Sequence, residues 1–250
     1  MKCVKIKLLD LCCKAGGCSM GYYQAAQELG IKIEIVGVDI EPQPNYPFNF
    51  IQADAVEYLI SNGHKYTHIH ASPPCQKYTQ QSAIYRKQGK EYSDLLEIIR
   101  PIIHKLRKPS VIENVMSSPI RPDIVLRGDL FGLKTLRKRK FELNNWFMLQ
   151  PGIQHIKRGA VVHDGKYITI TGNGNLGSMN KKKQFTKFIH ARGTVLKTWS
   201  EVMRIDWMTC DELREAIPPL YTRYIGLSFF TYQTYEKSTI INPCTSHRTD

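Results

Sequence analysis

The chain has 250 residues, of which 42% are hydrophobic and 23% charged, a composition that is ordinary for a folded, soluble protein with a full core. It contains no apolar run of the roughly 20 residues that a transmembrane helix needs and nothing that resembles a signal peptide, so we expect an intracellular protein with no membrane partner. The formal net charge of +13 is compatible with an anionic partner.

The first 115 residues alternate strand-like apolar runs with amphipathic, helical stretches. We expect strands at 4–12, 33–38, 48–52, 67–71 and 110–113, and helices at 19–29, 55–60 and 92–106. Strands and helices in turn predict an α/β fold, with a parallel sheet whose strands are joined by crossover helices.

The pattern changes after Phe141 to a polar, glycine-bearing and basic stretch that continues to about Lys197, with one alternating strand at 166–171. This stretch predicts a small inserted module. From Lys134 to Lys197 the sequence has 14 Lys and Arg but only two acids. A solvated basic surface would interleave acids with its bases, so the near-absence of acids favours a polyanion-binding surface.

Helical character returns near the C-terminus. A helix is expected at 210–216, with Asp211 as its cap and the two prolines at 218–219 as its end. A last amphipathic helix is expected at 220–232, and the polar tail from 236 to 250 is expected to be loose.

The seven cysteines are interpreted as reduced thiols, because their number is odd and Cys12 and Cys13 are adjacent. With Cys18 they form one cluster, and no second cluster completes four ligands. A structural metal is therefore not expected.

The segment from Asp10 to Gly17, DLCCKAGG, joins the first strand to the first helix. Its glycines allow the backbone to approach a ligand, although a tight turn would need them equally. Asp39 follows the second strand and suits ribose hydroxyls, and Asp54 follows the third and suits an adenine amino group. Either acid alone could cap a helix, but two at successive strand ends favour a nucleoside cofactor.

Residues 72–76, SPPCQ, place Cys75 directly after one strand, and Glu113 ends the next. A thiol at the mouth of a parallel sheet is suited to nucleophilic attack, with the carboxyl available as an acid. His68 and His70 share one face of a strand, and we interpret them as packing residues. The GxGxxG pattern at 172–177 lacks a following helix and is interpreted as a loop.

Five segments occur in the order that C5-cytosine DNA methyltransferases show, and the chain resembles that family, most closely its compact phage and prophage members. The segments are residues 10–17 (DLCCKAGG), 74–76 (PCQ), 113–115 (ENV), 137–141 (RKRKF) and 215–226 (EAIPPLYTRYIG). The resemblance implies a Rossmann-like, S-adenosylmethionine-dependent methyltransferase fold with helices on both faces of a mostly parallel sheet. It implies a catalytic, cofactor-binding domain at 1–142, a target-recognition module at 143–205, a helical segment packing back on the sheet at 206–235 and a polar tail at 236–250.

The same resemblance implies residue roles. Cys75 is the nucleophile, Glu113 the acid that faces the cytosine ring, and Arg139, with Arg137, the guanidinium near the base. The cofactor is implied to contact Asp10, Cys12, Ala15, Gly16, Gly17, Asp39, Ile40, Asp54, Ala55 and Pro74. Nucleic acid is implied to contact Gln76, Tyr78, Lys138, Lys181, Lys182 and Lys183.

Two positions depart from the family, which usually has an aromatic residue where Cys12 stands and glycine where Lys14 stands. We expect a monomer that methylates a cytosine flipped out of duplex DNA, in the cytoplasm of a bacterial host or phage-infected cell, with a role such as restriction–modification. Two alternatives remain open at this point: a cytosine-5 methyltransferase that acts on RNA resembling transfer RNA, and a catalytically silent nucleic-acid-binding homologue.

Overall fold

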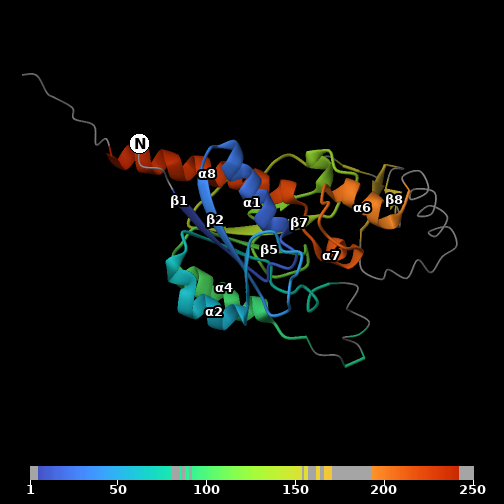
Figure 1. Cartoon of the computed structure of the whole chain (residues 1–250), viewed down its shortest axis with the longest axis horizontal. Helices are drawn as coiled ribbons and strands as arrows, with labels where there is room; N and C mark the ends of the chain where they lie inside the picture. The colour runs from blue at the N-terminus through green and yellow to red at the C-terminus, as the bar shows by residue number, and fades with distance from the viewer. Residues whose placement is uncertain are drawn as a thin grey trace, which may run out of the picture.

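The structure is a computed structural model that describes residues 5–79, 85, 88–89, 92–153, 155–156, 162–163, 166–170 and 193–241. One sheet has seven strands in the order β3-β2-β1-β4-β5-β7-β6 (Figure 1). The strands are β1 (Lys5–Leu11), β2 (Lys32–Asp39), β3 (Asn49–Gln52), β4 (His68–Ala71), β5 (Ser110–Asn114), β6 (Ile124–Leu126) and β7 (Arg139–Asn144). Strands β1 to β5 are parallel, and β7 runs antiparallel to both of its neighbours.

Helices cover both faces of this sheet. On one face lie α1 (Gly17–Glu28) and α8 (Pro219–Ile241), and on the other α2 (Ala55–Asn62) and α4 (Leu95–Leu106) (Figure 1). Successive residues of a strand point to opposite faces, so Leu8 packs in the cluster beneath α1 and α8, whereas Leu9 packs in the cluster above α2 and α4. Two short 3-10 helices, η1 (Gly63–Lys65) and η2 (Gly128–Phe131), lie in connections.

A third core joins short elements beside the sheet. The strand β9 (Tyr167–Ile168), which pairs with β8 (Val162–His163), packs with α6 (Val195–Met203) and α7 (Cys210–Glu215). The amide of Ile168 donates to the carbonyl of Lys134 at 2.8 Å, which ties this unit to the segment that leads into β7. Ala15 belongs to the same core, so the unit also contacts the turn between β1 and α1.

The alternation expected in the first 115 residues is confirmed, with ends that differ by a few residues. Periodicity did not predict the antiparallel strands β6 and β7. Because β7 continues to Asn144, the boundary expected at 142/143 falls inside a strand of the main sheet. The helix α6 also lies within the segment that we expected to be a polar module.

Two details near the C-terminus correct the sequence analysis. Thr209, not Asp211, is the N-cap of α7, because its side chain accepts from the amide of Glu212 while the Glu212 carboxylate accepts from the Thr209 amide. The helix α8 begins at Pro219 and extends to Ile241. The expected helix end at 232 was therefore wrong, and so was the expectation of a loose tail for residues 236–241. Neither glycine nor proline interrupts the chain from 227 to 242.

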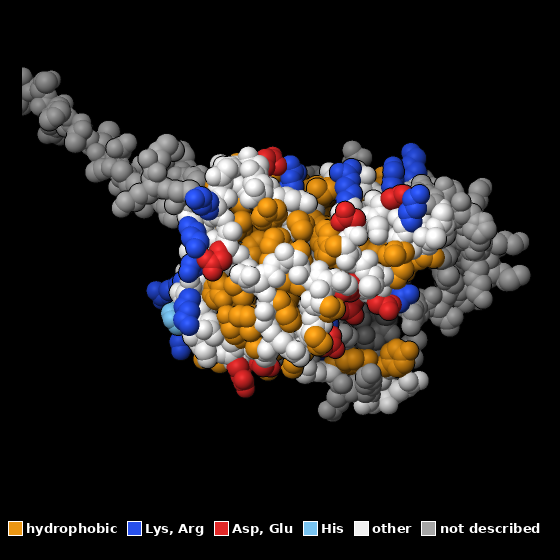
Figure 2. All heavy atoms as spheres, viewed as in Figure 1, with side chains coloured by type: hydrophobic (Ala, Val, Ile, Leu, Met, Phe, Trp, Pro, Cys, Tyr) orange, Lys and Arg blue, Asp and Glu red, His pale blue; other side chains and the backbone are white. Residues whose placement is uncertain are grey.

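The face seen in Figure 2 has hydrophobic side chains across its middle and Lys and Arg side chains gathered toward its edges. Among the helices of the described residues, none combines the length and apolar character needed to cross a membrane.

Candidate active site

A cavity of about 1160 Å³ opens at the carboxyl ends of the parallel strands. Its lining takes Asp10 from β1, Asp39 from β2 and Glu113 from β5, together with the loop that carries Cys75 after β4. The carboxyl edge of an open parallel sheet is where such folds bind ligands, because loops from neighbouring strands converge there. Residues that are distant in the sequence therefore share one cavity.

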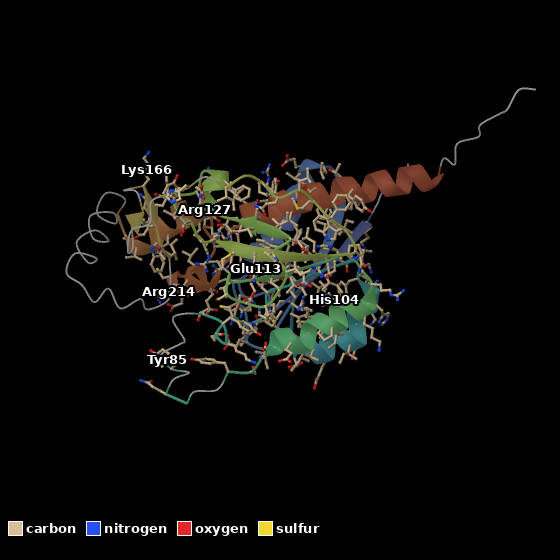
Figure 3. The ribbon with its side chains drawn as sticks, turned by 180° about the vertical axis from the view of Figure 1, so that it is seen from behind. Tyr85, His104, Glu113, Arg127, Lys166 and Arg214 are labelled. Carbon is tan, nitrogen blue, oxygen red and sulfur yellow. The ribbon has the colours of Figure 1, made fainter. Side chains whose placement is uncertain are left out.

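Glu113 lies in the middle of the sheet, near the end of β5 (Figure 3), and is only 5% exposed. The guanidinium Nε of Arg139, the first residue of β7, is 3.1 Å from Oε1 of this carboxyl. Burial raises the pKa of Glu113, whereas Arg139 and then Ser72 lower it, and burial prevails. Glu113 is consequently easier to protonate than an exposed glutamate and can hold a proton for a ligand.

The loop after β4 positions Cys75. The side-chain amide of Asn114 donates to the carbonyl of Pro73 at 3.0 Å, which ties the loop to the end of β5. The amides of Tyr78 and Thr79 donate to the carbonyl of Cys75 at 2.9 and 3.1 Å. Burial raises the pKa of the Cys75 thiol and Arg139 lowers it, with a net rise, so the resting group is a thiol.

The two predicted arginines have different surroundings. Arg137 has a φ of 20° and donates to the carbonyls of Ile170 at 2.9 Å and Arg214 at 2.5 Å. Burial lowers its pKa to about 9, and Tyr221 donates to its carbonyl at 3.0 Å. Arg137 thus connects the cavity wall to α7 and residues 166–170, and the ion pair with Glu113 is made by Arg139.

Asp10 is fully buried at the base of the cavity. Its Oδ2 accepts from the hydroxyl of Ser19 at 2.6 Å, and the Ser19 oxygen lies 2.6 Å from that of Tyr46. Its Oδ1 is buried and has no hydrogen-bond partner among the residues that the structure describes. Burial raises the pKa of Asp10 to about 7, against the Ser19 hydrogen bond. The unpartnered oxygen fits a ligand that brings a cationic or hydrogen-bond-donating group.

The other two acids line the same cavity. Asp39 accepts from the amides of Lys14 and Glu41, both at 3.1 Å, which fixes its carboxylate at the end of β2. Asp54 accepts from two amides in the first turn of α2 through Oδ1, so the capping role that the sequence left open is present. Its position in the lining leaves a ligand-binding role open as well.

Most other predicted site residues also line the cavity, namely Cys12, Ala15, Gly17, Ile40, Ala55, Pro74, Gln76 and Lys138. Gly16 and Tyr78 are outside the lining. Gly16 has a φ of 81°, and a Cβ there would lie 2.8 Å from Pro47, so the turn itself requires glycine. The Tyr78 hydroxyl donates to Asp94, the N-cap of α4. Lys181, Lys182 and Lys183 lie outside the described residues.

The structure adds residues that the sequence analysis did not assign to the site. Lys14 pairs across the cavity with Glu41 at 2.8 Å and with Glu215 of α7 at 3.5 Å. The lining also includes Cys18, Ser72, Ser117, Met208 and Arg214. Ser72 belongs to the SPPCQ motif, so the sequence could have assigned it to the site. Nothing local in the sequence signals that residues beyond 205 reach this cavity.

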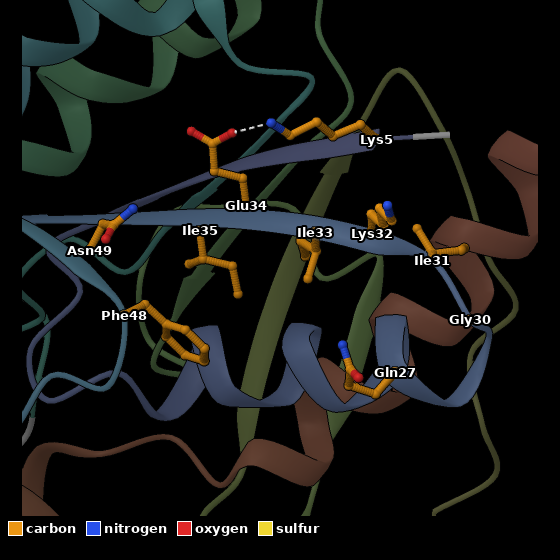
Figure 4. A pocket seen from close by; sticks show the side chains of 10 residues that line it. All are labelled: Lys5, Gln27, Gly30, Ile31, Lys32, Ile33, Glu34, Ile35, Phe48 and Asn49. Atoms are coloured by element: carbon orange, nitrogen blue, oxygen red, sulfur yellow. Dashed lines mark ion pairs between the residues drawn. The ribbon is translucent and has the colours of Figure 1, made fainter. Parts of the chain in front are cut away.

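A second hollow, of about 680 Å³, lies at the opposite, amino ends of β1 and β2 (Figure 4). Its charged side chains include Lys5 and Glu34, which pair at 2.8 Å. Cys75, Glu113, Arg139, Asp10 and Asp39 all line the first cavity and not this one. Within the described ranges, no cluster of three or more His, Cys, Asp or Glu side chains could hold a metal ion.

No family model matches the sequence, and no curated protein matches it. The structure is similar to that of the S. pombe Dnmt2 methyltransferase, with a TM-score of 0.54 and 14% identity over 92% of this chain and 99% of that one. It is also similar to the Entamoeba histolytica methyltransferase EhMeth, with a TM-score of 0.55 and 12% identity over 93% of this chain and 99% of that one. The chain therefore has the Rossmann-like α/β fold of these methyltransferases, with a mostly parallel seven-stranded sheet.

Proposed function

We propose that this protein is an S-adenosylmethionine-dependent methyltransferase that acts on C5 of cytosine in DNA. The observation that carries the proposal is that Cys75 and Glu113 line one cavity, with Arg139 paired to Glu113. The names of the two similar structures, both methyltransferases, support the reaction class. Within that class we propose the compact phage or prophage type that the sequence resembles, acting as a monomer in the cytoplasm.

The cavity fits S-adenosylmethionine. The unpartnered Oδ1 of Asp10 suits the amino group of the methionine part, Asp39 suits the ribose hydroxyls, and Asp54 suits the adenine amino group. When bound, this cofactor supplies a methyl group activated by a sulfonium. Because Cys12 stands where an aromatic residue is usual, adenine would be held there without ring stacking.

The chain's own residues explain how an unreactive carbon becomes nucleophilic. Cytosine C5 attacks weakly until a thiolate adds to C6, which forms an S–C6 bond and moves electron density to C5. Arg139 favours the thiolate of Cys75 electrostatically, and a protonated Glu113 donates to N3 to stabilise the resulting enamine. Once C5 carries the methyl group, solvent takes the C5 proton, and the electron pair left behind forms the C5–C6 double bond. The S–C6 bond breaks to release Cys75 as a thiolate, and N3 returns its proton to Glu113.

This chemistry requires an extruded base, because C6 of a stacked cytosine is not accessible to a thiolate. Gln76 and Lys138 line the cavity and are suited to hold the strand beside the flipped base. We propose that the basic segment after β7, with Lys181, Lys182 and Lys183, provides phosphate contacts that offset the unstacking free energy of a few kcal/mol.

The test measures transfer of a labelled methyl group to duplex DNA by the wild type, Cys75→Ala and Cys210→Ala. Cys210 lies in α7, outside the cavity lining, and serves as the control. Cys75→Ala should lose activity by roughly 10³-fold or more, because the reaction then lacks its nucleophile. Cys210→Ala should keep it. Equal labelling by the wild type and Cys75→Ala would end the nucleophile assignment.

Four further measurements test the adduct, separate the alternatives and identify the product. Duplex DNA with 5-fluorocytosine should retain a covalent adduct with the wild type, since fluorine cannot leave as a cation in place of the C5 proton. Preferential labelling of structured RNA in competition would assign the reaction to RNA, and no cofactor binding by calorimetry would favour a silent homologue. Bisulfite sequencing of DNA from an expressing host would identify the methylated sequence.

A further inference from the structure

A chain of polar groups runs through the core from α1 to the cavity. The hydroxyl of Tyr22 lies 3.0 Å from Nδ1 of His70, and Nε2 of His70 lies 3.1 Å from the hydroxyl of Ser72. Tyr22 and His70 are both fully buried, whereas Ser72 lines the cavity. Buried polar groups are retained when they are hydrogen-bonded, and a satisfied network of this kind fixes side-chain orientation.

The register of the sheet brings the end of this chain to Glu113. Ala71 of β4 is level with Ile112 of β5, so the next residues, Ser72 and Glu113, are neighbours across the two strands. Residues at one level of a parallel pair project to the same face, and here that is the face of His70 and Val111. The hydroxyl of Ser72 is one of the groups that favour the ionised form of Glu113.

The direction of the hydrogen bonds between Tyr22, His70 and Ser72 follows from the number of hydrogens that each group can donate. Burial lowers the pKa of His70 to about 3, so its ring is neutral, with one nitrogen donating and the other accepting. The buried Tyr22 hydroxyl needs an acceptor for its hydrogen, and Nδ1 is the acceptor within reach. His70 therefore donates from Nε2 to Ser72, which leaves the Ser72 hydrogen for Glu113. Cys18, with Sγ 3.8 Å from the Ser72 oxygen, can donate its thiol hydrogen there.

We propose that Ser72, oriented by His70 and Tyr22, is a positioning residue that donates to one oxygen of Glu113 and thereby fixes how this carboxyl is presented to the ligand. The catalytic consequence rests on the proposed function, but the hydrogen bond itself does not. The titratable and charged groups around Glu113 are Arg139 of β7, Arg137 before it, Cys75 of the loop after β4, Cys18 of α1 and Asp10 of β1.

The first test is a pH titration of Glu113. The readout is the infrared carbonyl band of its protonated form, isolated in difference spectra between the wild type and Glu113→Gln. Ser72→Ala should raise the midpoint by about one pH unit, because one hydrogen bond to the carboxylate is lost while burial remains. Ser72→Thr keeps the hydroxyl and should restore the wild-type midpoint. His68→Leu is the control: His68 is equally buried and packs against the ring of Tyr22, but neither of its ring nitrogens hydrogen-bonds to Tyr22, His70 or Ser72, so the midpoint should stay at its wild-type value.

The second test needs no substitution. Nitrogen-15 NMR of the wild type should show the tautomer of His70 protonated at Nε2 and unprotonated at Nδ1, unchanged between pH 5 and 8. The opposite tautomer would overturn the proposed direction, and it can be observed even if Ser72→Ala does not fold.

The outcomes distinguish this inference from the proposed function. A wild type that transfers no methyl group overturns the function, whereas the Glu113 titration still tests the hydrogen bond. An active wild type with an unchanged Glu113 midpoint in Ser72→Ala overturns the role of Ser72. If both hold, methyl transfer should fall in Ser72→Ala and return in Ser72→Thr.

Discussion

At the scale of single residues, the cavity holds a carboxyl whose ionisation is opposed by its surroundings. Asp10 is fully buried; one oxygen accepts from Ser19, and the other has no hydrogen-bond partner within the described part of the chain. Burial, followed by the charges of Asp39 and Glu113, raises its pKa to about 7 from 3.8, although the Ser19 hydrogen bond lowers it. A carboxyl of this kind is held for a ligand at the expense of stability.

This pKa predicts how Asp10→Asn changes stability with pH. The folded wild type binds a proton that the unfolded chain releases, so its free energy of unfolding falls as pH rises from about 4 to 7, whereas the asparagine has no charge to bury. Relative to wild type, the variant should gain up to about 4 kcal/mol from pH 4 to pH 8. Denaturant unfolding without cofactor at several pH values measures the difference, and a constant difference would contradict the prediction.

At the scale of elements, the packing of α1 against α8 connects the start of the chain with its end. The hydroxyl of Thr222 in α8 donates to the carbonyl of Cys18 in α1 at 2.7 Å. A Cβ on Gly21 would lie 2.1 Å from the carbonyl oxygen of Pro219, so the two backbones touch there. Because α1 carries Ser19, Tyr22 and Cys18, this contact also positions groups behind Asp10 and Glu113.

Gly21→Ala should therefore destabilise the protein by about 1–3 kcal/mol, since the added methyl group must separate two packed helices. Gly152→Ala is the control, because a Cβ there meets nothing within 4 Å, and it should change stability by less than about 0.5 kcal/mol. Chemical denaturation measures both values. Equal stability of the two variants would show that the helices do not touch as described.

At the scale of the whole molecule, the excess positive charge is unevenly distributed. The segment from Lys134 to Lys197 carries 14 basic residues against two acids, whereas the rest of the chain carries 21 against 20. This segment includes Arg139, the partner of Glu113, and Lys138, which also lines the cavity, so a polyanion bound at these two residues would lie beside the cavity. Binding to phosphates releases counterions and is weakened by salt.

We predict that affinity for duplex DNA falls steeply with salt and that replacing Lys181, Lys182 and Lys183 by alanine reduces the slope of log affinity against log salt by up to about 0.9 per lysine. Lys5→Ala with Lys32→Ala is the control, because both line the hollow at the opposite end of the strands. Fluorescence anisotropy across salt concentrations measures the slopes. A larger loss in the control pair would place the binding surface elsewhere.

The sequence alone was sufficient to predict the parallel part of the sheet. It was also sufficient to predict that the candidate catalytic groups lie together at the carboxyl edge of that sheet. Alternating strands and helices define crossover connections, and these bring successive strand ends such as Cys75 and Glu113 to one side of the sheet. Periodicity is a local signal, so it failed for β7, whose place beside β5 is fixed by pairing between Glu113 and Phe141. It failed equally for α6 and for the full length of α8.

What the sequence by itself determined is therefore the residue types and the strand ends at which they stand. Only the tertiary structure decided which of two neighbouring arginines meets Glu113, because the carbonyls of Ile170 and Arg214 take the hydrogen bonds of Arg137 and leave the ion pair to Arg139. It also placed His70 behind Ser72 and α7 against the cavity. The contacts of Arg137 with Ile170 and Arg214 join residues tens of positions apart, and their free energy exists only when the packed chain brings both partners together.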